Sequence, residues 1–361
     1  MDSLTDPLKE IYVDYARAGL PGNIHVDLTY ECPLDCIHCY AKGSETLHPE
    51  LMDTAMVMDL LDQAAELGTI EVGFSGGEPL LRKDIWELIE YARRLHFVVK
   101  LKTSGIYLTQ GHIDFMAGLG LVWVDISLHG ISPQVHDAIT KVPGSFQKAM
   151  SAIRALHRAG IRVQVNSSVL QSNFHDIPKL RQFLDDLGIG NGLSMSIMPS
   201  ETKGMGPQKN AMAGDAFIQT SLAMFKKDGI KPPKTDGYDL SEPLCYAGRS
   251  SMHVGPDGLV RPCVTWPVVA GDLKTQSLRD IWFDSPVFKR IRKLFMKDRQ
   301  QCRSCNLFGY CNFCPGRAFQ ATGDPIMPYT DACTAAQWTR EAYERFTGLA
   351  PDTPGQGPKD R

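Results

Sequence analysis

The chain has 361 residues, of which 43% are hydrophobic and 22% charged, and its formal net charge at pH 7 is −3. This composition is ordinary for a globular enzyme with room for one large and one small domain. The sequence has no basic block that would indicate a nucleic-acid or membrane surface. It also has no long apolar run that would indicate a membrane span. The start MDSLTDPLKE lacks the basic and apolar regions of a secretory signal, so we expect a cytoplasmic protein.

Six runs rich in apolar and β-branched residues predict strands at 24–29, 70–75, 98–104, 121–127, 162–169 and 193–198. Amphipathic stretches between them predict helices at 52–68, 83–95, 145–160 and 177–188. Repeated strand–helix–strand units imply parallel strands with crossover helices. Six units are too few for a closed eight-stranded barrel, so we predict an α/β fold with a partial (β/α)6 barrel. Periodicity alone leaves an open doubly wound sheet as the alternative.

The pattern changes after the sixth predicted strand. Residues 200–212 predict a polar loop and 214–227 a helix, and short elements, turns and cysteines follow from 228 onwards. The end of the chain, 348–361, is rich in proline and glycine and predicts disorder. We therefore expect an N-terminal extension (1–22), a partial barrel (23–227), a small cysteine-rich domain (228–340) and a helix end with a disordered tail (341–361).

The ten cysteines fall into two groups. Three lie at Cys32, Cys36 and Cys39, and the other seven lie between Cys245 and Cys333. A reducing compartment disfavours disulfides, so grouped cysteines there are more often metal ligands or catalytic thiols. The clustering therefore predicts metal sites.

The first group, Cys32-x3-Cys36-x2-Cys39, follows the first predicted strand directly. A [4Fe–4S] cluster usually takes four cysteines, so three leave one iron open to a substrate or cofactor. A zinc site with His38 as fourth ligand is the alternative. The segment GGEP (76–79) follows the second predicted strand, and parallel strands place their carboxyl ends, and hence functional sites, at one rim.

Two motifs together resemble the radical S-adenosylmethionine (SAM) superfamily. They are Cys32-Pro-Leu-Asp-Cys36-Ile-His-Cys39-Tyr40, with an aromatic residue beside the last cysteine, and Gly76-Gly77-Glu78-Pro79. The resemblance implies that the cysteines hold a SAM-binding [4Fe–4S] cluster and that GGEP binds the methionine amino group of SAM. Glycines let a backbone approach a ligand closely, and backbone carbonyls accept hydrogen bonds from an ammonium group.

The resemblance also implies SAM contacts at the ends of later strands. The candidates are Ser104, Ser127, Asn166 and Ser168, each of which is equally well explained as a solvated strand end. The superfamily often has an arginine before a GSF-type helix start, but this chain has Lys141 in that region, so the partner of the SAM carboxylate is not assigned. Asp125 and His129 flank Ser127 and are weaker candidates for lining a substrate cavity.

The C-terminal cysteines resemble those of the SPASM domain, which binds auxiliary [4Fe–4S] clusters. The segment VGPDGLVRPC (254–263) predicts a tight hairpin that ends at a cysteine. The resemblance implies a distal cluster on four cysteines and a proximal one on three: Cys302, Cys305, Cys311 and Cys333, and then Cys245, Cys263 and Cys314. Only two residues separate Cys311 and Cys314, where the family usually has three. Paired zinc ribbons are the alternative.

The resemblance covers about residues 22–340 and implies three [4Fe–4S] clusters, reductive cleavage of SAM to a 5′-deoxyadenosyl radical, and hydrogen abstraction from a substrate. KTSG (102–105) and CNFCPGRAFQATGD (311–324) resemble peptide maturases of the pyrroloquinoline-quinone and mycofactocin type, so a peptide is the expected substrate. The alternatives are a small molecule, such as a haem side chain or a sugar, and a non-catalytic metal-binding interaction protein. Expected partners are an electron donor such as flavodoxin or ferredoxin and, because residues 1–23 are few, a separate leader-peptide-recognition protein.

Overall fold

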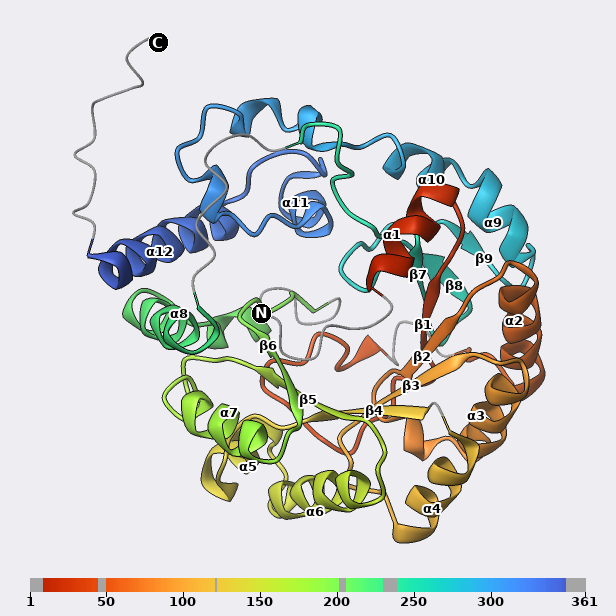
Figure 1. The fold of residues 1–361 in the computed structure, drawn as a ribbon. Coiled ribbons are helices and arrows are strands. Elements are labelled where there is room, and N and C mark those ends of the chain that lie inside the picture. Colours follow the sequence, from red (N-terminus) through yellow and green to blue (C-terminus); the bar gives the residue numbers. More distant parts are fainter. Residues whose placement is uncertain (1–8, 45–49, 121, 201–205, 230–238, 349–361) are drawn as a thin grey trace.

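The fold is taken from a computed structural model, which describes residues 9–44, 50–120, 122–200, 206–229 and 239–348 (Figure 1). Its centre is one nine-stranded sheet in the order β6-β5-β4-β3-β2-β1-β7-β8-β9. The first six strands are all parallel, and they are β1 (Asn23–Asp27), β2 (Glu71–Ser75), β3 (Val98–Thr103), β4 (Val122–Ser127), β5 (Val163–Ser168) and β6 (Gly190–Ser194). This confirms the predicted parallel strands.

Alternation along the strands divides the sheet into an apolar and a polar face. Ile24 and Val26 of β1 lie opposite Val72 and Phe74 of β2, and all four are buried in the main hydrophobic core. Residues between these positions, such as His25, point to the other face. That second face is the inner, concave side of the sheet, where polar side chains gather.

Helices connect successive parallel strands and cover the apolar face (Figure 1). They are α2 (Thr54–Glu66), α3 (Ile85–Arg94), α4 (Gln110–Leu119), α5 (Pro133–Thr140), α6 (Ser145–Arg158) and α7 (Ile177–Asp186). Asp53 caps α2 by accepting a hydrogen bond from the backbone N–H of Met56 at 2.8 Å. Since these helices lie outside a curved sheet, the partial barrel is confirmed over the doubly wound alternative.

The cysteine-rich region extends the barrel sheet. Strand β7 (Ser251–Val254) pairs in parallel with β1, and β8 (Leu259–Arg261) and β9 (Gly271–Asp272) follow in antiparallel order. The predicted hairpin is thus confirmed. Around it lie α9 (Leu278–Asp284), α10 (Pro286–Ile291), α11 (Pro315–Thr322) and α12 (Thr330–Thr347). The indole of Trp282 in α9 is fully buried and donates to the carbonyl of Gly19, so this region is fixed to the first part of the chain.

Several boundaries differ from the sequence-based expectation. Strand β6 begins three residues earlier than the predicted 193–198, because its glycine-rich start pairs with β5. The helix predicted at 214–227 is α8 (Asp215–Asp228), and it packs on α12, which is longer than the short elements expected after residue 228. Helix α1 (Lys9–Ala18), which precedes the first strand, and helices α4 and α5 within the barrel were not predicted. The predicted disordered tail, from 349 onwards, and residues 201–205 of the predicted loop lie outside the described residues.

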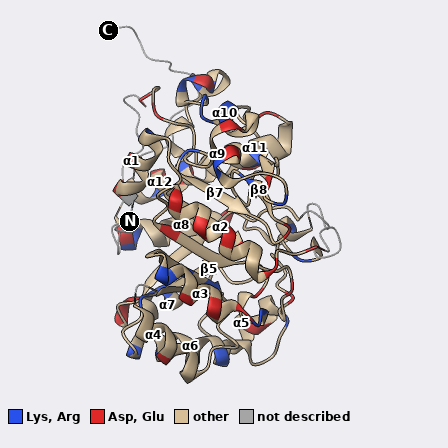
Figure 2. Cartoon of the chain, turned by 90° about the vertical axis from the view of Figure 1, so that its right-hand side faces the viewer, with Lys and Arg blue, Asp and Glu red and all other residues tan. Residues whose placement is uncertain are grey.

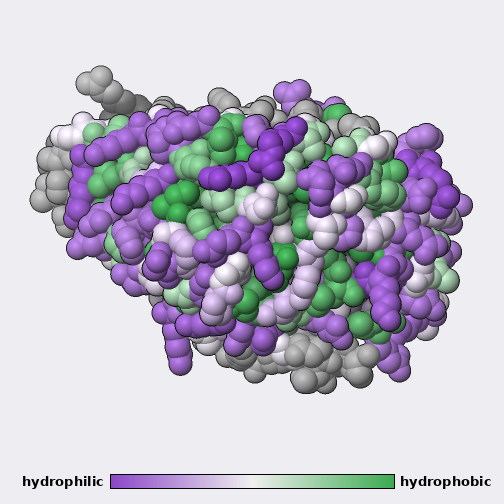
Figure 3. All heavy atoms as spheres, turned by 90° about the horizontal axis from the view of Figure 1, so that it is seen from below, coloured by the Kyte–Doolittle hydropathy of each residue, from purple (hydrophilic) through white to green (hydrophobic). Residues whose placement is uncertain are grey.

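Acidic and basic side chains are interspersed along the outer helices (Figure 2). The face seen from below is mostly hydrophilic with apolar patches between the charged residues (Figure 3). Among the described residues, no helix is both long enough and apolar enough to cross a membrane.

Candidate functional site

The first cysteine group lies on the loop after β1, at the carboxyl end of the parallel strands. The end of α5 holds this loop, because the N–H groups of Asp35 and Ile37 donate to the carbonyls of Thr140 and Ile139 at 2.9 and 3.1 Å. Asn210 donates to the Ile37 carbonyl at 2.8 Å. These hydrogen bonds fix the backbone between the cysteines, so the three thiols lie close together on one loop.

Burial of the three thiols suits a bound metal cluster. Burial is the main cause that raises the pKa of Cys32 to about 11 and that of Cys36 to about 12, and neighbouring thiolates of the same group act in the same direction. Metal binding deprotonates such thiols and offsets the repulsion between them. His38 lies in the same loop, and its buried Nδ1 has no hydrogen-bond partner among the described residues. The residues present therefore fit a cluster held by three thiolates.

The glycines of GGEP bring the second loop against the first. The N–H of Gly77 donates to the Thr29 carbonyl at 2.7 Å, and that of Glu78 donates to the Glu31 carbonyl at 2.8 Å. A Cβ atom on Gly77 would lie 2.6 Å from the carbonyl oxygen of Tyr30, and Gly76 has a φ of 128°. Only glycine permits this approach of backbone to backbone.

Replacing Gly77 by alanine is expected to destabilise the protein by about 2 kcal/mol, because backbone atoms must move to admit the methyl group. The shift displaces the loop that carries Cys32, so iron loading should also fall. Urea unfolding and iron content after reconstitution measure both effects. Gly118→Ala is the control, since a Cβ there meets nothing within 4 Å. Equal stability and iron content in the two variants would contradict this role of Gly77.

Glu78 is fully buried, and protein groups satisfy its carboxylate. It accepts hydrogen bonds from the Thr103 hydroxyl at 2.6 Å, from the Ser104 N–H at 2.9 Å, and from the Ser104 hydroxyl. It also caps the 3-10 turn Pro79–Leu81 through the N–H of Leu80. The Glu78 side chain therefore links the end of β2 to the end of β3. One of these hydrogen bonds uses the hydroxyl of Ser104 as its donor.

The other predicted SAM contacts lie on the inner face of neighbouring strands. Ser127 of β4 and Asn166 of β5 are register partners, and Asn166 donates to Asp125 at 3.3 Å. The N–H of Ser168 donates to the ring of His129, which is buried. Tyr40 is partly buried beside the first cysteine group. The structure thus gathers these residues at the carboxyl rim, and their contacts with SAM stay a prediction.

The seven C-terminal cysteines form two groups. Cys245 and Cys314 interact electrostatically with Cys263, and burial is the main cause that raises the pKa of Cys263 to about 12. Gly316 at the start of α11 packs against the backbone of Thr265, which brings the N-cap Cys314 to this turn. Cys311 and Cys333 each interact with Cys302, and Cys333 also interacts with Cys305. This grouping is the one expected from the sequence, while the ligand roles stay predictions.

Different cysteine groups lie toward the two ends of strand β1. Cys245 precedes β7, which runs parallel to β1, and Cys263 follows the antiparallel strand β8. Both therefore lie toward the amino-terminal end of β1, whereas the Cys32 loop lies at its carboxyl end. A substrate inside the barrel would lie between the two groups.

A polar network that the sequence analysis missed lies on the inner face between these ends. His25 and His253 each contact one carboxylate oxygen of Asp27 through Nε2 at 3.0 Å. Lys102 lies 3.1 Å from Nδ1 of His25. His25 and Asp27 alternate with apolar residues in IHVD, which could have marked them as inward-facing. His253 could not be found this way, because its strand joins β1 from 226 positions away in sequence.

The lysine fixes the proton positions of this network. An ammonium group only donates, so His25 accepts at Nδ1 and donates from Nε2 to Asp27. Asp27 then accepts from His253 as well, and the two histidines hold the pKa of its carboxyl far below the usual range despite burial. Burial, and next the charge of Lys102, lower the pKa of His25 to about 4. The same three groups could bind a metal ion through one atom each, but the ammonium group at His25 Nδ1 and its positive charge favour a proton-sharing network.

Acidification is expected to destabilise the metal-free protein between pH 6.5 and 4. His136, like His25, is buried, and desolvation lowers its pKa to about 4. Each histidine binds its proton near pH 6.5 when unfolded, so unfolding takes up protons in this window. The contribution of the two neutral histidines to the free energy of unfolding is complete above pH 6.5. As the pH falls below 6.5, each histidine lowers this free energy by about 1.4 kcal/mol per pH unit.

Urea unfolding at pH 7, 6 and 5 measures this slope. The variant His136→Asn keeps an acceptor for the N–H of His129, which donates to His136 at 3.1 Å, but cannot titrate. Its slope should be shallower by the contribution of one histidine. A free energy of unfolding that is constant from pH 7 to 5 would contradict the prediction.

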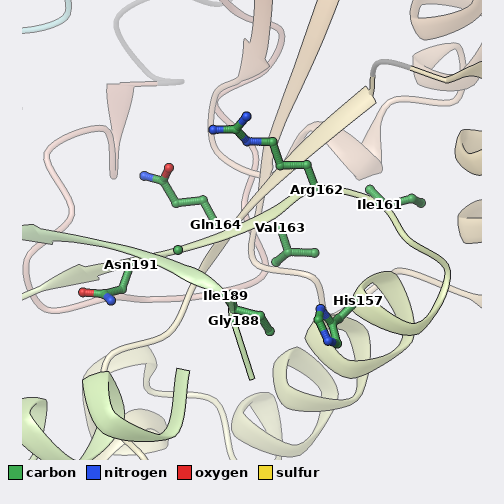
Figure 4. Close-up of a pocket in the computed structure, with 9 residues that line it drawn as sticks. His157, Ile161, Arg162, Val163, Gln164, Gly188, Ile189 and Asn191 are labelled. Atoms are coloured by element: carbon green, nitrogen blue, oxygen red, sulfur yellow. The ribbon is translucent and has the colours of Figure 1, made fainter. Parts of the chain in front are cut away.

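A surface hollow lies at the other end of two of the parallel strands (Figure 4). It lies at the amino-terminal ends of β5 and β6, between Arg162, Gln164 and Asn191, with His157 of α6 at its side. No predicted site residue lines it. Parallel barrels carry their sites at the opposite, carboxyl rim, so this hollow is not the functional site.

Comparison with known proteins adds to this geometry. Residues 26–184 match the radical SAM superfamily, and residues 245–306 match the iron–sulfur cluster-binding domain SPASM. An AdoMet-dependent heme synthase from Methanosarcina barkeri is 27% identical over 333 residues, which are 86% of this chain and 95% of the relative. A PqqA peptide cyclase from Methylocella silvestris is 28% identical over 325 residues, which are 84% and 85% of the two chains.

Two solved structures share the fold. Streptococcus suis SuiB bound to the precursor peptide SuiA has a TM-score of 0.66 at 17% identity, covering 92% of this chain and 82% of SuiB. The structure of anSMEcpe with bound AdoMet and the Cp18Cys peptide has a TM-score of 0.68 at 16% identity, covering 91% and 99%.

Proposed function

The chain carries a radical SAM domain followed by a SPASM domain, and on this premise we propose that it oxidises or crosslinks a peptide by SAM-dependent radical chemistry. The observation that carries the proposal is the loop of three grouped thiols packed against GGEP at the carboxyl rim. When bound there, the cluster and SAM supply an electron and a 5′-deoxyadenosyl radical that abstracts hydrogen from the substrate.

We assign roles to the residues at the rim. Cys32, Cys36 and Cys39 would hold the cluster, and the backbone of Gly76 and Gly77 would receive the SAM amino group. Glu78 holds the ends of β2 and β3 together, which keeps that backbone in place. Five further residues would complete the SAM site: Ser127, Asn166 and Ser168 on the inner face, together with Tyr40 and Ser104.

The two C-terminal groups would hold auxiliary [4Fe–4S] clusters, giving three in total. Four cysteines, Cys302, Cys305, Cys311 and Cys333, suffice for one cluster. Cys245, Cys263 and Cys314 supply three ligands, so a non-cysteine group would complete the other. We place the radical SAM barrel at 23–227 and the auxiliary domain at 228–340, between an N-terminal extension and a C-terminal helix end with a tail.

Relatives and structural neighbours support a peptide substrate. The PqqA peptide cyclase acts on a peptide, and SuiB and anSMEcpe were solved with peptides bound. A haem-forming reaction is the second candidate, because several relatives that each cover more than four fifths of this chain are heme synthases. A cytoplasmic location, a flavodoxin- or ferredoxin-like electron donor and a leader-recognition protein complete the proposal.

Two substrates offered in parallel test the choice between the candidates. The reduced, reconstituted protein receives SAM and either a synthetic peptide encoded beside its gene or an iron tetrapyrrole with propionate side chains. We expect the peptide to stimulate 5′-deoxyadenosine formation and to lose mass equal to two hydrogens. Stimulation and a mass change only with the tetrapyrrole would replace the peptide proposal by the haem-forming one.

A further inference from the structure

Arg299 is a buried cation beside the group Cys302, Cys305, Cys311 and Cys333. It lies between the short turns Met296–Asp298 and Gln300–Cys302, and only 4% of its surface is exposed. A buried arginine is normally paired with a carboxylate. Among the described residues, no ion pair joins Arg299 to an acidic side chain, so its positive charge is not neutralised by the protein.

Two aromatic rings hold this guanidinium in place. It lies 3.9 Å from the ring centre of Phe313 and 4.7 Å from that of Phe308. Stacking of this kind fixes the position of a guanidinium without cancelling its charge. One terminal nitrogen is 4.0 Å from Sγ of Cys311, and the buried Nε has no acceptor among the described residues. The structure therefore points a desolvated charge at a cysteine sulfur.

The charge reaches more than one member of the group. Arg299 interacts electrostatically with both Cys311 and Cys333. Its carbonyl also accepts from the N–H of Cys302 at 3.0 Å, so its backbone is part of the cysteine turn. Guanidinium stays protonated at every working pH, and solvent screens it little in a buried position.

We propose that Arg299 raises the reduction potential of the [4Fe–4S] cluster bound by these four cysteines. Reduction adds a negative charge to a cluster, and a fixed cation beside the sulfurs stabilises the reduced form. Cys305 and Cys333 are exposed, so this cluster is the one that an external redox partner can approach. Arg299 thus makes the surface-facing cluster easier to reduce than it would be without this charge. The inference rests on the cluster assignment of the proposed function.

A redox titration of the full-length protein tests this role without knowledge of the substrate. The starting variant carries Cys32→Ala, Cys36→Ala and Cys39→Ala, so only auxiliary clusters remain, and their reduction is followed by electron paramagnetic resonance. The wave that disappears in Cys311→Ala belongs to the four-cysteine group. Adding Arg299→Gln should lower the reduced-to-oxidised ratio of this wave at least tenfold at fixed potential, which equals about 59 mV for one electron, and should leave the other wave in place.

Matched variants separate charge from structure. Arg303→Gln removes an equal charge from an exposed side chain next to Cys302 and should leave the ratio within twofold. Arg299→Lys keeps the positive charge, so it should retain most of the increase in the reduction potential of the cluster. Should Arg299→Gln lose iron, the uncharged Arg299→Met, which fills the space between the rings, is titrated instead.

The outcomes distinguish this inference from the proposal beneath it. A full complement of auxiliary iron with an unchanged or raised ratio in Arg299→Gln would overturn the role of Arg299 alone. Absence of any auxiliary cluster from the starting variant, seen in its iron content before any titration, would overturn the cluster assignment and with it the role of Arg299.

Discussion

Replacing Cys36 by alanine is expected to lower 5′-deoxyadenosine formation by more than about 100-fold. Mutation of residues that only orient a metal ligand already costs about 10- to 100-fold, and Cys36 is the central member of a group of three with no spare cysteine in its loop. The measurement is the rate of 5′-deoxyadenosine release from reduced, iron-reconstituted protein.

Cys333→Ala is the matched control for this experiment. It removes an exposed cysteine of the distant four-cysteine group, so substrate-independent SAM cleavage should stay within a fewfold of the unmodified protein. The Cys36→Ala protein should keep its auxiliary iron. If SAM cleavage persisted in Cys36→Ala and vanished in Cys333→Ala, the assignment of the SAM-cleaving site to the first loop would be wrong.

Asp27→Asn is expected to reduce the free energy of unfolding at pH 7 by about 3 kcal/mol. The carboxylate accepts one N–H from each of two rings and is 4% exposed. An amide offers one acceptor oxygen in place of two and carries no charge, which leaves one of the two buried ring donors unsatisfied. Urea unfolding of the metal-free variant measures the loss.

The pH dependence of this loss has a defined sign. The pKa of Asp27 is lowered in the folded protein, so its contribution is complete above the unfolded value near 3.9 and is lost only as the pH falls below it. The difference in the free energy of unfolding between the unmodified protein and the Asp27→Asn variant should therefore be present in full at pH 7. Asp14→Asn is the control, because the Asp14 side chain is 73% exposed and its ion pair with Arg17 lies on the surface. Equal losses in the two variants would contradict the network.

Local pattern was enough to predict the six parallel strands, the helices α2, α3, α6 and α7, and both cysteine groups, but not α4 and α5. The apolar and β-branched run that predicts β1 is a feature of a few neighbouring residues, and it agrees with the structure. The grouping of Cys245 and Cys263 with Cys314 follows the pattern of a known family, which carries long-range information that composition lacks.

Features that depend on long-range pairing could not be predicted from local pattern. Nothing in SMHV (251–254) indicates that it joins β1, yet this pairing puts His253 beside Asp27 and makes the network. The starting point of β6 is set by its partner β5 and not by its own glycine-rich sequence. The engagement of Glu78 with Ser104 likewise arises only when the ends of β2 and β3 meet.

The arrangement of the two cysteine regions along the barrel gives the account its central claim. The first region lies at the carboxyl rim with GGEP, and Cys245 and Cys263 of the second lie toward the amino-terminal end of β1, with polar inward residues between them. This geometry suits a reaction in which hydrogen is removed from a substrate near one cluster and an electron leaves toward another.

The most direct test combines two quantities on one oxygen-free sample. The protein is reconstituted with iron and sulfide, reduced and given SAM, and both its iron content and its 5′-deoxyadenosine are measured. The account predicts iron for three [4Fe–4S] clusters, about twelve atoms per chain, together with SAM cleavage. Bound zinc in place of iron, with no 5′-deoxyadenosine, would contradict it and leave a zinc-stabilised binding protein as the explanation of the ten cysteines.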